Sequence, residues 1–388
     1  MFYYRYRPAT ELAIKELIYD EMYFASEAEC NDPYEGKIFA RFEKDEGRWN
    51  RLINCALSTF PGISAFKYIE QKISKYFFDK SPLYIDDVLN EPLEEFLKIA
   101  DNDIERIVYK NLLNQIKEYV TLYIPPEKYF VSFSKNCNNT LMWAHYAGNH
   151  RGHCLVFRVS GQKIYQDPTW KKTSLAYTTP RSFSPKMSFG IDDNFTLRDI
   201  TYIDVPEYVD AFLCFPPAVY GDTVSEEELK NFRSKFNSTY FQKNIAWKYE
   251  EETRILLSSG IPWLAGQKLS ATSHQRLFHY DSTQLVGIVL GTKMPENQKV
   301  RIEEIIKEKV NRWYDGSMRD KTVSNFVIFE ERLSTSDRET NIVPVKIFDG
   351  ITFIDKHDKD FDQKYYSWKE GEAIHFYSTN KAEKVKII

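Results

Sequence analysis

The side chains best suited to chemistry gather in one short stretch, residues 129–159. This stretch carries three histidines, two serines and a tryptophan, which are His145, His150, His153, Ser132, Ser134 and Trp143. Alternation along a strand would place Ser132 and Ser134 on one face and Phe133 on the other. Two hydroxyls that face the same way beside an Asn-rich turn are a candidate binding surface, although a serine on a strand is often only an edge hydroxyl.

The three histidines allow an interpretation as a metal site. His145, His150 and His153 are spaced by five and three positions across two glycines. Such spacing could gather imidazoles around zinc, with Asp32 or Glu35 as a further ligand. The alternatives need no metal. His145 could hydrogen-bond behind the serine pair, and His150 could clamp a phosphate at the turn.

Three consecutive glutamates form the second group of interest. Glu250 to Glu252 follow an aromatic Trp-Lys-Tyr segment and lead into an apolar run. Alternation along a strand would put Glu250, Glu252 and Arg254 on one face. Arg254 is then their expected counter-ion, which would lower their pKa values. A run of glutamates is commonly a solvated charged segment, but its place ahead of an apolar strand indicates that one of them is buried.

The elements that position these residues are expected to be short strands and helices in mixed order. A helix should be capped by Thr140 and ended by Gly148 and Gly152. Strands are predicted at Phe2–Tyr6, Tyr129–Phe133, Cys154–Val159, Glu250–Ser258, Leu285–Leu290 and Val323–Phe329, and helices at Glu11–Tyr19, Glu226–Ile245 and Glu296–Val310.

Between the first strands and the central stretch, residues 40–125 are largely helical by pattern. We therefore predict an α+β fold in which mixed and antiparallel sheets form a central cleft, with a helical insertion at about residues 40–125. Residues 1–349 are expected to form this single domain. Residues 350–388 are expected to form a C-terminal extension.

Composition narrows the possible functions. The chain has 388 residues and a net charge of -4. A slightly acidic chain of this kind does not attract nucleic acid through its overall charge. The first residues, MFYYRYRP, do not have the pattern of a signal peptide, and no window has the length of a membrane span. The five cysteines show no C-x-x-C spacing. We expect a cytoplasmic protein with reduced cysteines.

A set of short motifs in fixed order resembles a bacterial family of unknown function, usually recorded as a numbered domain and met in mobile and defence-associated loci. The resemblance spans residues 2 to about 330. The motifs are Tyr4-Arg5-Tyr6, Asn31-Asp32-Pro33-Tyr34-Glu35, Leu141-Met142-Trp143-Ala144-His145-Tyr146-Ala147, His150-x-Gly152, Trp247-x-Tyr249-Glu250-x-Glu252-x-Arg254 and Ile288-Val289-Leu290-Gly291.

Three separated elements also resemble the ADP-ribosyltransferases. In that family a first strand bears an Arg or His, a second bears Ser-x-Ser followed by a short helix and a strand, and a third begins with Glu-x-Glu. Here Arg5 lies on the first strand. Residues 132–134 read Ser-Phe-Ser and precede the predicted helix and strand, and residues 250–252 open a third strand. The helical insertion has no counterpart in that family.

The resemblance implies a role for each group. Arg5 would bind the diphosphate or ribose of NAD, since a guanidinium binds phosphate in a bidentate way. Ser132 and Ser134 would hold the nicotinamide ribose. Glu252 would stabilise an oxocarbenium-like state as nicotinamide leaves, and Glu250 would be the general base. The other residues expected to bind the dinucleotide are Tyr6, Trp143, His145, Tyr146 and His150.

The leading expectation is thus an NAD-consuming, ADP-ribosyltransferase-like enzyme, such as a toxin or anti-phage defence effector. NAD would be its substrate, a protein or nucleic acid its acceptor, and an antitoxin or other protein a possible partner. Two alternatives stay open. One is a metal-dependent nuclease or phosphoesterase that uses His145, His150, Asp32 and Glu35. The other is a non-catalytic sensor or partner-binding module that uses the aromatic cleft and the helical insertion.

Overall fold

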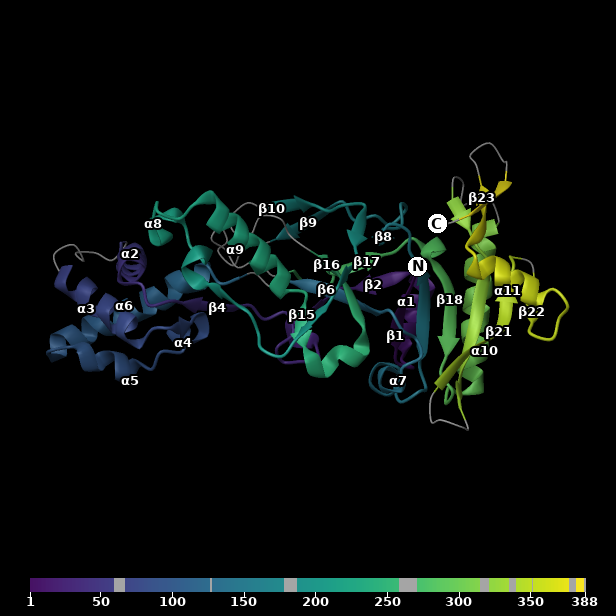
Figure 1. Cartoon of the computed structure of the whole chain (residues 1–388), viewed down its shortest axis with the longest axis horizontal. Coiled ribbons are helices and arrows are strands. Elements are labelled where there is room, and N and C mark those ends of the chain that lie inside the picture. The colour runs from purple at the N-terminus through teal and green to yellow at the C-terminus, as the bar shows by residue number, and fades with distance from the viewer. Residues whose placement is uncertain are drawn as a thin grey trace.

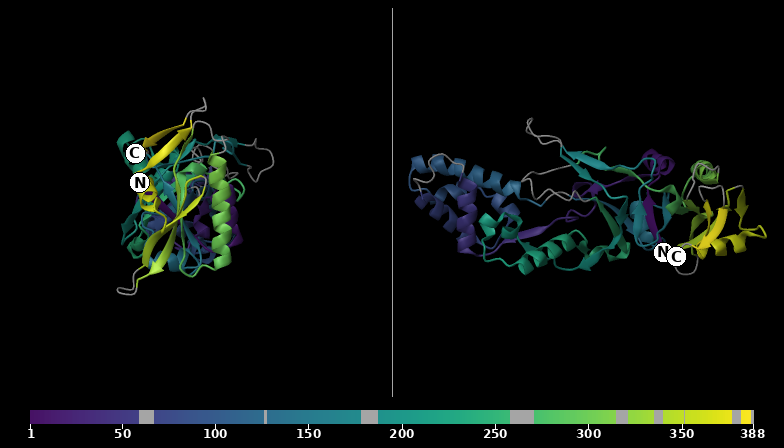
Figure 2. Two further views of the ribbon diagram at one scale, coloured as in Figure 1. Left: turned by 90° about the vertical axis from the view of Figure 1, so that its right-hand side faces the viewer. Right: turned by 90° about the horizontal axis from the view of Figure 1, so that it is seen from above.

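The molecule is elongated, with a helical body at one end, a large sheet in the middle and the residues beyond about 290 at the other end (Figures 1 and 2). The computed structural model describes residues 1–58, 67–125, 128–177, 187–257, 271–314, 321–334, 340–350, 352–376 and 382–386. Among these residues, no helix has the length and apolar character needed to cross a membrane.

A ten-stranded sheet organises the middle of the molecule. Its order is β12-β16-β6-β1-β7-β18-β20-β21-β22, and β3 also pairs with β6. Neighbouring strands are antiparallel except for β18 and β20, which are parallel, so the predicted α+β class with mixed sheets is confirmed. The strands are β1 (Phe2–Arg7), β3 (Ala25–Ser26), β6 (Tyr129–Ser134), β7 (His153–Arg158), β12 (Arg198–Asp199), β16 (Glu252–Leu257), β18 (Leu285–Leu290), β20 (Phe326–Leu333), β21 (Thr340–Phe348) and β22 (Phe353–Asp355).

The two faces of strand β6 carry side chains of different kinds. On β6, Val131 and Phe133 point into a buried apolar core, while Ser132 and Ser134 point to the opposite face because side chains alternate along a strand. The apolar face is covered by α1 (Glu11–Tyr19) and α10 (Glu296–Tyr314), which contribute buried residues to the same core. On the second face, α7 and α11 pack on β7, β18 and β20 in another apolar cluster, so the polar groups gather where β1, β6 and β16 adjoin.

The connection between α7 (Thr140–Tyr146) and β7 packs tightly on the end of β1. A Cβ at Gly152 would lie 2.1 Å from the carbonyl oxygen of Arg7, closer than atoms can approach without displacement of the backbone. Glycine at position 152 therefore permits the close approach of β7 and β1, and it fixes where α7 sits relative to the sheet.

The helical body has a core of its own. Trp49, Phe77, Phe96 and Tyr109 are fully buried in it, and the indole nitrogen of Trp49 donates to the hydroxyl of Ser81 at 2.7 Å. The region predicted as a helical insertion supplies most of this body. Its helices are α2 (Glu46–Leu57), α3 (Lys67–Lys80), α4 (Ile85–Leu89), α5 (Leu93–Phe96) and α6 (Asp103–Leu122), joined from later in the chain by α8 (Pro217–Tyr220) and α9 (Glu226–Thr239).

Short sheets connect the larger parts. They pair β2 (Glu21–Tyr23) with β17 (Leu277–His279), β4 (Phe39–Phe42) with β5 (Leu83–Tyr84) and β14 (Tyr208–Asp210), β8 (Lys163–Tyr165) with β11 (Asn194–Thr196), β9 (Ser174–Tyr177) with β10 (Met187–Gly190), β13 (Thr201–Ile203) with β15 (Gln242–Asn244), and β23 (Glu372–Phe376) with β19 (Lys321–Val323) and β24 (Ala382–Lys386).

Several predicted elements are confirmed and others differ, among them the strand predicted at Val323–Phe329, which is divided between the end of β19 and the start of β20. The strands at the N-terminus, at Tyr129 and at Leu285, and the helix Glu11–Tyr19, lie where expected. The cap of α7 is Asn139 rather than Thr140, because the Asn139 side chain accepts hydrogen bonds from the next backbone amides. The helix predicted to reach Ile245 ends at Thr239, and β15 follows it. Ser258, at the end of a predicted strand, lies outside the described residues.

The segment after residue 349 packs against the sheet. In α11 (Phe361–Lys369), the ring of Trp368 stacks on Phe2 with the ring centroids 4.8 Å apart. The indole nitrogen of Trp368 donates to the carbonyl oxygen of Val286 at 3.0 Å. The C-terminal segment is therefore joined to the strands that carry the N-terminus.

This packing predicts that the segment contributes to stability. Trp368→Ala should lower the free energy of unfolding by about 3–5 kcal/mol, since it removes a buried indole and leaves a cavity. Tyr366→Ala is the matched control, because Tyr366 is 64% exposed on the same helix. Urea unfolding followed by tryptophan fluorescence and circular dichroism measures both. Equal stability of the two variants would show that the segment does not pack as described.

Candidate active site

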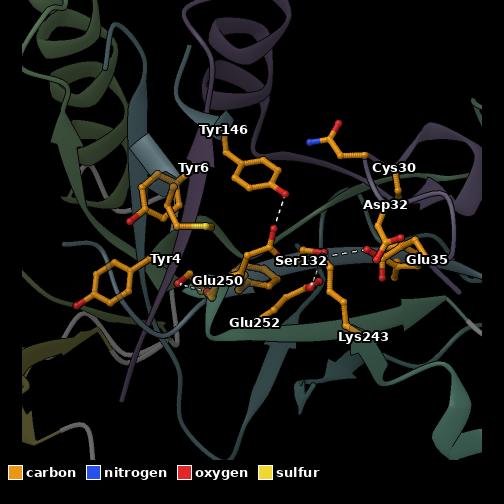
Figure 3. A pocket seen from close by; sticks show the side chains of 15 residues that line it. Tyr4, Tyr6, Cys30, Asp32, Glu35, Ser132, Tyr146, Lys243, Glu250 and Glu252 are labelled. Atoms are coloured by element: carbon orange, nitrogen blue, oxygen red, sulfur yellow. Dashed lines mark hydrogen bonds and ion pairs between the residues drawn. The ribbon is translucent and has the colours of Figure 1, made fainter. Parts of the chain in front are cut away.

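A pocket opens beside the sheet, where β1, β6, β15 and β16 meet α7, a short 3-10 helix and the turn at residues 30–35 (Figure 3). Its cavity has a volume of about 130 Å³. The lining residues are Tyr4, Tyr6, Cys30, Asn31, Asp32, Glu35, Phe130, Ser132, Phe133, Ser134, Met142, Tyr146, Lys243, Glu250 and Glu252. Four carboxyl groups, several aromatic rings and one ammonium group therefore share a small volume.

The register of the sheet brings side chains from distant parts of the chain into one row. Tyr4 of β1 is paired with Ser134 of β6, and Ser134 is paired with Glu252 of β16. Directly paired residues share a face, and all three line the pocket. Ser132, two residues before Ser134, lies on the same face and hydrogen-bonds to the carboxylate of Glu252.

Glu250 reaches the pocket by a different route from the one predicted. It ends a short 3-10 helix, Ile245–Glu250, and Glu251 then adopts a left-handed conformation with φ of 45°. The strand begins only at Glu252. The prediction that Glu250 and Glu252 share a strand face is therefore wrong, and it is the turn at Glu251 that places both carboxylates in the pocket.

A buried ammonium group holds three carboxylates together. The Nζ atom of Lys243 lies 2.6 Å from Glu250, 2.9 Å from Glu35 and 3.0 Å from Glu252. All four side chains are at most 6% exposed. Three buried carboxylates at such distances would repel one another strongly without a cation between them.

Arg254 supplies the second cation and is fully buried. Its Nε and Nη2 atoms donate to the two oxygens of Glu252 at 2.6 and 2.9 Å, which is the bidentate geometry that suits a guanidinium. The Nη2 atom also pairs with Glu35, and Nη1 donates to the carbonyl oxygen of Tyr240 at 3.2 Å. The expectation that Arg254 is the counter-ion of both glutamates holds for Glu252, but Glu250 pairs with Lys243 and its pKa is raised.

The pKa values of Glu250 and Glu252 are shifted in opposite directions from that of a free glutamate. Burial opposes ionisation of Glu252, but the charge and hydrogen bonds of Arg254, with Lys243 and Ser132, lower its pKa to about 2. Burial raises the pKa of Glu250, and the negative charge of Glu252 adds to this effect against the opposing charge of Lys243. One carboxylate is thus held ionised while its neighbour binds a proton more readily, a pattern typical of acid–base sites.

The turn at residues 31–35 delivers the remaining carboxyl groups. The carboxylate of Asp32 accepts a hydrogen bond from the backbone nitrogen of Tyr34 at 2.9 Å, and the backbone nitrogen of Glu35 donates to the carbonyl oxygen of Asp32 at 3.0 Å. This is the local chemistry that favours Asp ahead of proline in turns. Asp32 and Glu35 are both buried, and both line the pocket.

Tyrosines form one wall of the pocket. The hydroxyl of Tyr146 on α7 donates to Glu250, and Figure 3 shows this hydroxyl directed at the carboxylate. The hydroxyl of Tyr6 donates to the carbonyl oxygen of Asn136 at 2.9 Å. The hydroxyl of Ser134 donates to the carbonyl oxygens of Glu250 and Asn136. Ser134 therefore fixes the backbone beside the pocket, while Ser132 bonds to the carboxylate.

Arg5 does not join this pocket, which corrects the prediction that it does. Tyr4 and Tyr6 face the pocket, so alternation along β1 turns Arg5 to the other face of the sheet. There it is buried near Glu16 and Tyr280, and burial lowers its pKa to about 10. The pocket's ammonium group comes from Lys243 instead.

Three further predicted residues also lie outside the pocket lining. Trp143 is fully buried, and its indole nitrogen donates to the carbonyl oxygen of Cys137 at 2.9 Å. His145 is exposed. His150 is buried, with its Nδ1 atom 2.7 Å from the carboxylate of Glu331. The helix and turn that carry these residues are placed as predicted, but their side chains point into the core, to solvent and toward β20.

Lys243 is the central residue that the sequence did not reveal. It lies in a stretch whose pattern predicted the end of a long helix, where a lysine is normally solvated. The structure instead places it on β15, which pairs in parallel with β13. Only the polar Asn244, which caps the following 3-10 helix, signals that the long helix ends earlier.

A family model described as a protein of unknown function, DUF2971, matches residues 142–255. The match begins within α7, covers Tyr146, Lys243, Glu250 and Glu252, and stops before the end of β16. It leaves out β1 and the turn that carries Asp32. No match was found among the curated proteins or among the solved structures.

The low pKa of Glu252 predicts a pH dependence of stability. Its contribution is fully present above the pKa of an unfolded glutamate, about 4.5, and is lost as the pH falls toward 2. Glu252→Gln should cost about 3–5 kcal/mol at pH 7, because two buried cations lose a partner. Below about pH 4.5 the difference from the wild type should shrink.

Urea unfolding from pH 7 down to the lowest pH at which the protein folds tests this. Glu251→Gln is the matched control, since Glu251 is an exposed neighbour. A difference between wild type and Glu252→Gln that already shrinks between pH 7 and 6 would contradict the lowered pKa.

Proposed function

We propose that the protein consumes NAD, cleaving the bond between nicotinamide and ribose and transferring ADP-ribose to an acceptor. The observation that carries this proposal is the convergence of Glu252, Glu250 and Ser132 on one pocket, where the two glutamates have opposite pKa shifts. Glycosyl transfer uses such a pair, one carboxylate ionised and the other exchanging a proton.

The charge of the pocket supports a cationic group in it. Among the described residues, the carboxylates of Asp32, Glu35, Glu250 and Glu252 are set against the cations Lys243 and Arg254, which leaves an excess of two negative charges when every group is ionised. The nicotinamide ring of NAD is a pyridinium cation, and aromatic rings such as those of the tyrosine wall attract cations. Neutral nicotinamide would lose both attractions, which favours its release.

The size of the pocket agrees with this assignment. A cavity of about 130 Å³ is smaller than the roughly 300 Å³ of pockets that enclose whole drug-sized ligands. It would hold the nicotinamide end of NAD and not the complete dinucleotide. The diphosphate, which is anionic, would lie outside the acidic cavity.

The proposed reaction balances with the groups present. The bond between C1′ of the ribose and the pyridinium nitrogen breaks, and its electron pair goes to that nitrogen, so nicotinamide leaves neutral. The ionised Glu252 stabilises the positive charge that develops on the ribose. A nucleophilic oxygen or nitrogen of the acceptor, or water, then bonds to C1′ and gives its proton to Glu250, whose raised pKa makes it a better base.

The sheet order adds support. The three elements that resemble the ADP-ribosyltransferases lie on β1, β6 and β16, which are adjacent strands. The departure is Arg5, which faces away from the pocket. A role for Arg5 in binding the diphosphate is not part of the proposal. As an NAD-consuming transferase, the protein would act on a macromolecule in the manner of a toxin or defence effector.

The metal-dependent alternative draws less support. Of its four residues, Asp32 and Glu35 line the pocket, while His145 and His150 lie elsewhere. Within the described parts of the chain, no group of three or more His, Cys, Asp or Glu residues is arranged to hold a metal ion. The non-catalytic alternative rests on the same pocket, and the experiment below separates it from catalysis.

Release of nicotinamide from NAD tests the proposal. The wild type, incubated with NAD and a cell extract as a source of acceptor, should release nicotinamide, measured by chromatography. Glu252→Gln should slow this release by about 10²–10³-fold, because the developing positive charge loses its ionised partner. Ser132→Ala should slow it less, and Glu251→Gln should leave it unchanged.

Melting temperatures of the variants separate loss of catalysis from loss of fold. If the wild type releases no nicotinamide with or without extract, or if folded Glu252→Gln is as active as the wild type, the proposed reaction is wrong.

A further inference from the structure

A second cavity lies beside the sheet, on the side of α9 and the strand edge formed by β12. Its volume is about 340 Å³, within the range of roughly 300–1,000 Å³ typical of small-molecule sites. It shares no lining residue with the candidate active pocket. The residues that matter here are Lys128, Asn194, Arg198, Asn237, Tyr240 and Phe241.

Two cations without carboxylate partners set this cavity apart. Lys128, just before β6, has its Nζ atom 5.2 Å from the centroid of the Tyr240 ring. Arg198 of β12 has its Cζ atom 5.2 Å from the centroid of the Phe241 ring. Neither takes part in an ion pair within the described parts of the chain. Lys243 in the active pocket, by contrast, is held by three carboxylates.

The charge balance of the cavity favours an anion. Among the described lining residues, Asp192 carries the single carboxyl group against Lys128 and Arg198. Lys128 is half-buried, and burial lowers the pKa of its ammonium group. An ammonium group that is partly removed from water and faces an open cavity gains most from an anionic ligand.

The polar lining indicates the class of anion. A guanidinium group binds phosphate oxygens in a bidentate way, and a lysine binds them as a point charge. Asn194, Asn237 and Thr196 add amide and hydroxyl groups suited to a sugar or a base. The cavity is also larger than a lone phosphate ion requires. We propose that it binds a nucleotide through its phosphate groups, with Lys128 and Arg198 as the phosphate ligands.

The site is distinct from the active pocket, although one residue connects them. Tyr240 lines the second cavity, and its carbonyl oxygen accepts a hydrogen bond from Arg254. Arg254 in turn holds Glu252 and Glu35. The proposal stands apart from the proposed reaction, because it concerns binding at another place and needs no catalysis.

Calorimetric titration of the full chain with ADP, inorganic pyrophosphate and adenosine tests the proposal. ADP and pyrophosphate should bind with an affinity that falls as salt is added, while adenosine should bind far more weakly. Lys128→Gln and Arg198→Gln should each weaken ADP binding by about tenfold, and the double variant by more. Lys98→Gln, which removes a charge from an exposed ion pair on the helical body, should bind ADP like the wild type.

Glu252→Gln keeps the two sites distinguishable, since it should disable the active pocket and leave ADP binding intact. Arg198→Gln carries the test if the variants at half-buried Lys128 fail to fold, because Arg198 is exposed. The proposal is overturned if neither ADP nor pyrophosphate binds at millimolar concentration, or if adenosine binds as tightly as ADP. Unchanged ADP binding by Arg198→Gln, or much tighter binding of a single-stranded oligonucleotide than of ADP, also overturns it.

Discussion

The ammonium group of Lys243 is the interaction on which the site rests. It lies within 3.0 Å of three buried carboxylates, those of Glu35, Glu250 and Glu252. These come from a loop, a 3-10 helix and a strand that would otherwise separate, since buried like charges repel strongly. Arg254 donates two hydrogen bonds to Glu252 from the other side, so Glu252 stays ionised although it is buried, while burial raises the pKa of Glu250.

The two cations contact the glutamates differently, and the pKa values of Glu250 and Glu252 are therefore shifted in opposite directions. Arg254 bonds directly to Glu252 and Glu35, so that Glu252 stays ionised. The carboxylate of Glu250 pairs with Lys243, which it shares with Glu35 and Glu252, and accepts a hydrogen bond from the hydroxyl of Tyr146. A pair of carboxyl groups with divergent pKa values in a tyrosine-lined cavity suits a reaction in which positive charge grows on a sugar ring.

Local sequence patterns predicted the strands and turns that carry the site. The alternation in β6 and the Asp-Pro turn at residues 32–33 indicated which groups would meet, because both signals act over a few residues. Such patterns do not predict contacts between residues that are far apart in the sequence. The face to which Arg5 turns depends on which side of β1 is covered by α1. The burial of Lys243 depends on its pairing with a loop more than 200 residues earlier. The turn at Glu251 breaks the strand pattern with a left-handed residue that is not glycine.

The three histidines that the sequence singled out do not form a site. His145, His150 and His153 attracted attention by their type and spacing, yet His145 is exposed, His150 pairs with Glu331, and His153 is buried on the face of Arg7. Residue type alone overstated their role, because imidazoles also serve in packing and in structural hydrogen bonds. The glutamates were the more dependable signal, since three acidic residues ahead of a buried strand need cations near them.

We expect the acidic, tyrosine-walled pocket to bind a pyridinium cation in preference to a neutral pyridine ring. Binding of 1-methylnicotinamide, which is cationic, and of nicotinamide, which is neutral, measures this directly by calorimetry on the same protein. The account predicts that the cation binds at least about tenfold more tightly and that Glu250→Gln narrows the difference. Equal affinity for the two rings, or tighter binding of neutral nicotinamide, would contradict it.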